Sequence, residues 1–197
     1  MTPTCRPDPA DPSGSGAARA PRNAALATEI IIEDPRWEAA GLAALAGRAA
    51  EATLSHLGLA PESWEVVVLG CDDARIAGLN AEFRGKAAPT NVLSWPAAER
   101  GAVRPGDRPG PPDPAIPEIG DIALAYDTCA REAERYGIPL DRHATHLVVH
   151  GLLHCLGYDH ETDADASLME RVEGEILGKM GLPDPYIAMR PEAPRSG

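Results

Sequence analysis

Three histidines occur close together in the segment HGLLHCLGYDH, residues 150–160, at a spacing suited to a metal ion. On a helix His150 and His154 are one turn apart on the same face, so both imidazoles can reach one ion. Gly157 lets the chain turn out of the helix and bring back His160 as a third ligand. The fourth position of a tetrahedral zinc ion then stays open to water, as in catalytic sites. The spacing therefore predicts an open three-histidine zinc site.

The same ligand frame occurs in the metalloprotease motif H-E-x-x-H-x-x-G-x-x-H, where the glutamate is the general base. In this chain Gly151 occupies the position of that glutamate. Without a carboxylate there the peptidase mechanism loses its base, whereas metal binding is unaffected. The sequence thus favours a metal site and disfavours a peptidase.

Two further histidines precede the triad on the same predicted helix face. His143 lies about 16 Å along the axis from His154, too far to share an ion. His146 is a candidate for substrate contact or for support of a ligand, and a plain polar-face histidine explains it equally well. Cys155 projects about 100° away from His154, which indicates a packing residue.

Periodicity and turn residues predict alternating strands and helices along the chain. Strands are expected at about 27–33, 64–70, 90–95 and 120–126, and helices at about 36–57, 73–83, 128–136, 140–157 and 163–179. This order predicts one α/β or α+β domain, in which a mixed sheet of about four strands is covered by helices. The helix that carries the histidines is apolar outside its polar stripe, so we expect it to be central and buried.

The predicted domain covers residues 25–187 of the 197-residue chain. Residues 1–24 are rich in Pro, Gly, Ser and Ala and are expected to form a disordered tail. Residues 97–118 form a Pro/Gly-rich loop that is too long for a routine connection, and such loops are either functional lids or disordered excursions. The last residues of the chain, 184–197 (DPYIAMRPEAPRSG), are expected to be irregular. Residues 188–197 are expected to form a C-terminal tail.

Composition narrows the expected location and partners. The chain shows no apolar run of a signal peptide, no stretch of roughly 20 apolar residues and no C-x-x-C pair, which together predict a cytoplasmic protein. The formal net charge of −12 argues against a broad nucleic-acid-binding surface but leaves room for a local basic patch. Much of the acidity lies in residues 161–175, including Glu173, where it is expected to form a solvated helix face.

Four blocks, in this order, resemble the YbeY family of bacterial endoribonucleases: FRGKAAPTNVLSWP (83–96), GDIALA (120–125), HGLLHCLGYDH (150–160) and DPYI (184–187). The resemblance covers about residues 27–187. It implies a single-strand-specific endoribonuclease of ribosomal RNA maturation, one zinc ion on the three histidines, and the ribosomal small subunit as partner. It also implies a functional role for Arg84 of the R-G-K turn. Trp95 and Cys155 depart from the usual pattern by apolar exchanges.

The chemistry of the remaining candidates agrees with phosphate recognition. Arg84 can pair with phosphate oxygens and offset charge in the transition state, although spacing alone equally allows a solvated turn arginine. Lys86 can add phosphate affinity, and Asn91 and Ser94 can donate hydrogen bonds to a substrate, as alternatives to capping or strand-edge roles. His146 completes the candidate substrate-binding residues.

Two other functions remain open from the sequence. One is a ribosome-assembly or RNA-binding factor whose metal is structural, and the other is a metal-dependent hydrolase of a different substrate. Neither a membrane nor DNA is expected as a partner. The metal itself is not fixed, because imidazole also suits Ni, Cu and Fe.

Overall fold

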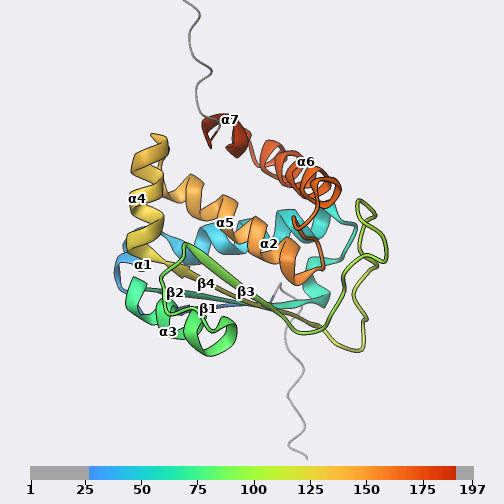
Figure 1. Ribbon diagram of the computed structural model, residues 1–197, viewed down its shortest axis with the longest axis horizontal. Helices are drawn as coiled ribbons and strands as arrows, with labels where there is room; N and C mark the ends of the chain where they lie inside the picture. The colour runs from blue at the N-terminus through green and yellow to red at the C-terminus, as the bar shows by residue number, and fades with distance from the viewer. Residues whose placement is uncertain (1–26, 190–197) are drawn as a thin grey trace, which may run out of the picture.

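A mixed four-stranded sheet organises the fold of the protein, which we analysed as a computed structural model that describes residues 27–189 (Figure 1). The strands are β1 (Ala27–Ile32), β2 (Glu65–Cys71), β3 (Val92–Pro96) and β4 (Glu118–Ala125). Their order is β1-β2-β4-β3, with β1, β2 and β4 parallel and β3 antiparallel to β4 at the edge. The predicted mixed sheet is thus confirmed.

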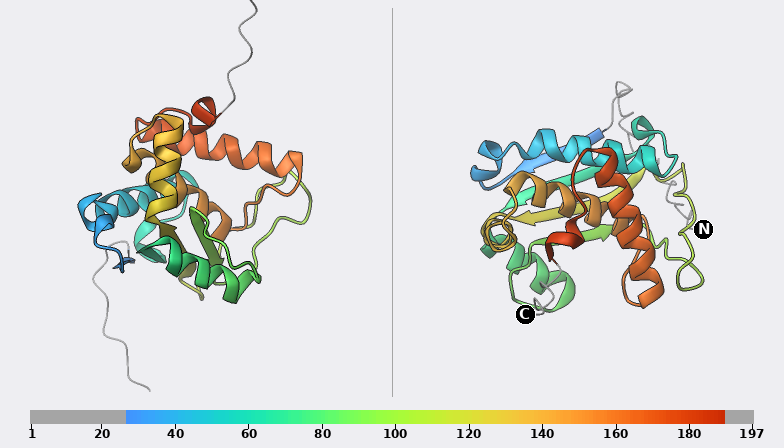
Figure 2. Two further views of the ribbon diagram at one scale, coloured as in Figure 1. Left: turned by 60° about the vertical axis from the view of Figure 1, so that its left-hand side comes forward. Right: turned by 90° about the horizontal axis from the view of Figure 1, so that it is seen from above.

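The helices lie on both faces of this sheet (Figures 1 and 2). They are α1 (Arg36–Ala39), α2 (Leu42–His56), α3 (Asp73–Arg84), α4 (Tyr126–Tyr136), α5 (Leu140–Cys155), α6 (Asp163–Lys179) and α7 (Pro185–Met189), with a 3₁₀ turn η1 (Pro61–Ser63). Helices α2 and α5 cover one face, and α3 covers the other. Helix α6 packs against α5 on the side away from the sheet, and α7 follows it.

Helix α5 is the central element of the larger core, as predicted. After its first residue, its apolar residues are completely or almost completely buried, including Val148, Val149, Leu152 and Leu153. These side chains meet α2, the sheet and α6 in one cluster. A helix enclosed in this way is held rigidly, so it can present polar side chains in a fixed geometry.

Two expectations about helices are wrong. The helix expected at 36–57 is broken because Gly41 has a left-handed backbone (φ 72°), which ends α1 and starts α2 in a new direction. The C-terminal segment expected to be irregular contains α7, Pro185–Met189. Residues 1–24, predicted as a tail, lie outside the described residues, as do residues 190–197.

None of the helices between residues 27 and 189 has the length and apolar character needed to cross a membrane.

Candidate metal centre and adjoining pocket

The three histidines predicted as ligands lie together at the C-terminal end of α5. His150 and His154 come from the last turns of the helix, and His160 returns after the turn at Gly157, whose φ is 91°. One ring nitrogen of each histidine lies within 4.8 Å of those of the other two. The group is thus compatible with one shared metal ion.

The hydrogen bonds of two of these rings direct their free nitrogens toward each other. Nδ1 of His150 lies 2.7 Å from a carboxylate oxygen of Glu173, and Nδ1 of His154 lies 3.0 Å from the carbonyl oxygen of Tyr158. Because both partners accept hydrogen bonds, each Nδ1 carries the proton, and each Nε2 of the neutral ring presents a lone pair. The two Nε2 atoms are 3.1 Å apart. Two facing lone pairs repel unless a cation lies between them.

This arrangement fits a tetrahedral metal ion. Zn–N bonds of about 2.0–2.1 Å place two ligand nitrogens about 3.3 Å apart, close to the observed separation. Burial, followed by the charges of His150 and His160, lowers the pKa of His154 to about 4. His154 is therefore neutral at pH 7, which is the form that binds metals. His160 is exposed, so the group faces solvent on one side.

Gly151 stands where a metalloprotease has glutamate, and the packing of α5 explains why it is small. A Cβ atom added to Gly151 would lie 3.1 Å from Cγ2 of Ile122 on β4. The position therefore faces the sheet at a close helix–strand approach. A glutamate there would have to displace Ile122. The packing therefore agrees with the inference that this chain lacks the general base of a metalloprotease.

Glu173 corrects one expectation and adds a residue that the sequence analysis missed. Expected on a solvated face of α6, its side chain is completely buried and contacts His150 and His146. Burial on its own would raise the pKa of Glu173, but hydrogen bonds from these histidines outweigh it and lower the pKa to about 2. The helical periodicity of α6 could have indicated that Glu173 faces inward. Glu173 lies four residues after Met169 and four before Leu177, so all three share the apolar stripe of the helix.

The other two histidines of α5 lie further from the triad. His146 is buried, and its Nε2 lies 3.2 Å from Glu173, so the structure places this candidate substrate residue behind His150. His143 is 1% exposed and its Nε2 lies 2.8 Å from Glu132 on α4. The expectation that His143 is too distant for the metal group agrees with this pairing.

Asn91, a candidate for substrate binding, is engaged by its own fold. Its Nδ2 donates to Glu132 at 2.9 Å, and its Oδ1 accepts from the backbone N–H of Val92 at 2.7 Å. These bonds fix the start of β3 against α4. These contacts agree with the capping role, which the sequence analysis gave as an alternative to substrate binding.

The R-G-K turn follows α3. Arg84 is the last residue of that helix, and the placement of its side chain lies outside the described structure. Gly85 has a left-handed backbone with φ 68°, and Lys86 is exposed. The turn thus presents at least one cation to solvent at the end of α3.

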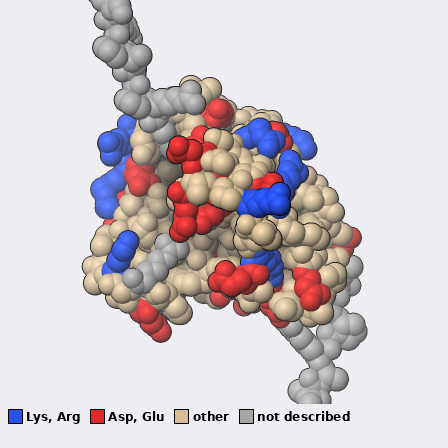
Figure 3. Space-filling model, turned by 45° about the vertical axis from the view of Figure 1, so that its right-hand side comes forward, with Lys and Arg blue, Asp and Glu red and all other residues tan. Residues whose placement is uncertain are grey.

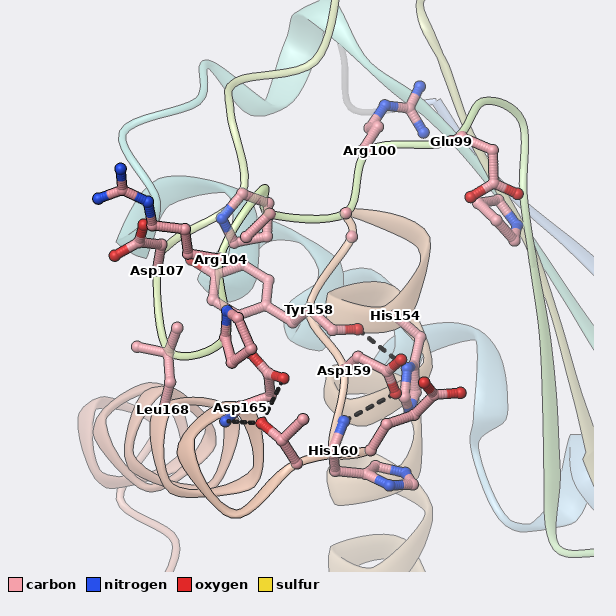
Figure 4. Close-up of a pocket in the computed structure, with 18 of the residues that line it drawn as sticks. Glu99, Arg100, Arg104, Asp107, His154, Tyr158, Asp159, His160, Asp165 and Leu168 are labelled. Atoms are coloured by element: carbon pink, nitrogen blue, oxygen red, sulfur yellow. Dashed lines mark hydrogen bonds between the residues drawn. The ribbon is translucent and has the colours of Figure 1, made fainter.

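Ser94 and two of the triad histidines line one pocket of about 690 Å³. Ser94 comes from β3, whereas His154 and His160 lie at the end of α5 and beyond it. Figure 4 shows His154 and His160 toward one side of this pocket and Arg104 and Asp107 toward the other. Among the candidate substrate residues, Ser94 therefore lines the same pocket as two of the triad histidines.

The long loop between β3 and β4 forms a wall of this pocket. Arg100 fixes the loop by donating to the carbonyl oxygens of Ile119 (3.1 Å) and Cys155 (3.0 Å). Near the middle of the loop the N–H of Gly106 donates to Asp165 at the start of α6 (2.7 Å). The loop is thus tied to β4, α5 and α6 and is part of the site's surroundings.

Charges of both signs line the pocket, including Arg100, Arg104, Glu99, Asp159 and Asp165. On the face shown in Figure 3, Lys and Arg side chains are interspersed with Asp and Glu side chains. On the face shown, the basic side chains of the described residues do not form one continuous patch.

Comparison with known proteins assigns the chain to a family. Residues 30–181 match the family model described as endoribonuclease YbeY. The protein named endoribonuclease YbeY from Paracoccus denitrificans is 57% identical over 171 residues, covering 87% of this chain and 96% of that protein. The one from Dinoroseobacter shibae is 56% identical over 189 residues, covering 94% and 97%. A solution structure from Thermotoga maritima covers 85% of this chain and 99% of its own, with a TM-score of 0.48 and 20% identity. The resemblance found in the sequence is confirmed, and the chain belongs to the endoribonuclease YbeY family.

Proposed function

We propose that this protein is a zinc-dependent endoribonuclease that cleaves single-stranded RNA in ribosomal RNA maturation. The convergence of His150, His154 and His160 beside an open pocket carries the proposal, because a metal ion held there with an open position could polarise a phosphoryl oxygen and activate water. Membership of a family whose relatives are named endoribonuclease supports RNA as the substrate. The ribosomal small subunit and the cytoplasm are part of the same proposal. The free thiols of Cys71, Cys129 and Cys155 fit a reducing compartment.

The proposed chemistry divides between the metal and the chain's own residues. His150, His154 and His160 would hold the zinc ion, which would supply the Lewis acidity that polarises a phosphoryl oxygen and lowers the pKa of water. Arg84 pairs with phosphate oxygens and offsets the charge that develops on them. Lys86 adds phosphate affinity without reading the base. Ser94, on the pocket wall, donates a hydrogen bond to the substrate.

Removal and return of the metal tests the proposal. After dialysis against a strong chelator, we expect cleavage of a single-stranded RNA oligonucleotide to stop, and one equivalent of zinc to restore it. The same oligonucleotide annealed to its complement should be cleaved much more slowly. Undiminished cleavage by metal-free protein would contradict the proposal. A zinc-loaded protein that sediments with small ribosomal subunits but cleaves no RNA would instead identify a binding factor with a structural metal.

Arg84 provides a second prediction. Arg84→Ala should lower the rate of RNA cleavage about 10²-fold, as removal of one transition-state donor does in other enzymes, while zinc content stays unchanged. Arg48→Ala, which removes an exposed arginine from α2, is the matched control and should retain the parent rate. The measurement is the cleavage rate under single-turnover conditions. Equal rates for the two variants would show that Arg84 is dispensable.

A further inference from the structure

The carboxylate of Glu173 is enclosed by polar groups from two other helices. Its Oε1 lies 2.7 Å from Nδ1 of His150, and its Oε2 lies 3.2 Å from Nε2 of His146, both on α5. The phenol of Tyr186, on the short helix α7, also donates a hydrogen bond to Oε2. The side chain of Glu173 is completely buried. Both carboxylate oxygens are thus satisfied without solvent.

Stability alone does not explain this group. An ionised carboxylate loses its hydration when it is buried, and even a well-paired buried ion often stabilises a fold no more than apolar residues of the same volume. One of the three partners, however, is a predicted metal ligand. A carboxylate on the Nδ1–H of a ligand histidine fixes the tautomer and the ring orientation, and it makes Nε2 a stronger donor toward the metal.

We propose that Glu173 and Tyr186 are positioning residues that hold His150 in its metal-binding form, so that the C-terminal helix α7 belongs to the metal centre. This rests on the proposed metal function. Glu173 contacts His150 directly, whereas Tyr186 acts one step further away by fixing the plane of the carboxylate. Burial and the negative charge of Glu173 raise the pKa of the Tyr186 phenol, which keeps it a donor.

The position of Tyr186 makes this contribution distinct from the triad. The ring of Tyr186 also packs edge-on against His146, with centroids 5.9 Å apart. Helix α7 is therefore attached to the site through both the hydroxyl and the ring of one residue, and the two contributions can be separated by removing the hydroxyl alone.

The test measures metal binding without RNA. We expect Tyr186→Phe to weaken zinc affinity several-fold and Glu173→Gln to weaken it about 10- to 100-fold, as substitutions beside metal ligands do elsewhere. Competition with a chromophoric chelator gives the affinity, and the visible spectrum of the cobalt-substituted protein reports ligand geometry. Tyr136→Phe is the matched control, because that ring packs against His143, outside the triad. It should keep the parent affinity and spectrum.

The outcomes separate this inference from the proposed function. Parent affinity and an unchanged cobalt spectrum in Tyr186→Phe would overturn the role of α7, and the same result in Glu173→Gln would overturn the role of the carboxylate. If the parent binds zinc with the expected losses in both variants but cleaves no RNA, the positioning roles stand and the nuclease proposal fails. If the parent binds no zinc, both fail. Circular dichroism confirms that each variant is folded, and Tyr186→Phe, which keeps the ring, remains informative if Glu173→Gln does not fold.

Discussion

Replacing His154 by alanine is expected to remove zinc from the protein and to lower RNA cleavage by at least about 10³-fold, since several kcal/mol of metal stabilisation are lost. The parent should retain about one zinc ion per chain after dialysis, and the variant very little. The reason is geometric: Nε2 of His154 lies 3.1 Å from Nε2 of His150, and the remaining two nitrogens cannot enclose an ion alone. Zinc content by atomic emission and the cleavage rate are the two measurements.

His143→Ala is the matched control for this substitution. It removes a histidine from the same helix, but one whose Nε2 pairs with Glu132 and does not belong to the triad. Because His143 is 1% exposed, we expect the control to lower the melting temperature while it keeps zinc and cleavage. Full zinc content in His154→Ala would remove the proposed metal site, whatever its cleavage rate.

The triad could be predicted from the sequence because its geometry is local. His150 and His154 are related by one helical turn, and Gly157 signals the turn that returns His160, so no knowledge of distant packing is needed. The strands and the buried α5 could be predicted for a similar reason, because β-branched runs and helical periodicity can be recognised within short stretches of sequence. The structure confirms the four strands and α5 with small shifts at their ends, whereas the helix expected at 36–57 is divided in two.

The groups around the triad could not be predicted because they depend on how distant elements pack. The inward direction of Glu173 follows from the packing of α6 on α5, and its acidic neighbours suggested a solvated face. Tyr186 follows from the docking of α7, in a segment without periodicity. The loop is held by Arg100, whose partners are backbone carbonyls of β4 and α5. Every residue has a backbone carbonyl, so residue types do not reveal which carbonyls accept a hydrogen bond from Arg100.

Gly157→Ala is expected to destabilise the protein far more than the same substitution at Gly58. Both glycines end a helix in the left-handed conformation, with φ 91° and 75°, and the next residue's N–H bonds to the carbonyl five positions back in each case. The conformational cost of alanine there is about 1–2 kcal/mol. At Gly58 nothing lies within 4 Å of an added Cβ, whereas at Gly157 it would lie 2.4 Å from the carbonyl oxygen of Arg100.

The clash at Gly157 involves backbone, so no side chain can rotate away to relieve it. The loop must move, which strains the bond between Arg100 and the carbonyl of Cys155 at the end of α5. We expect a total loss of about 3 kcal/mol or more in Gly157→Ala, against about 1 kcal/mol in Gly58→Ala. Urea unfolding of the metal-free proteins measures both. Because Gly157 lies between His154 and His160, zinc affinity should also fall in Gly157→Ala alone. Equal losses in the two variants would show that the loop is not fixed against this turn.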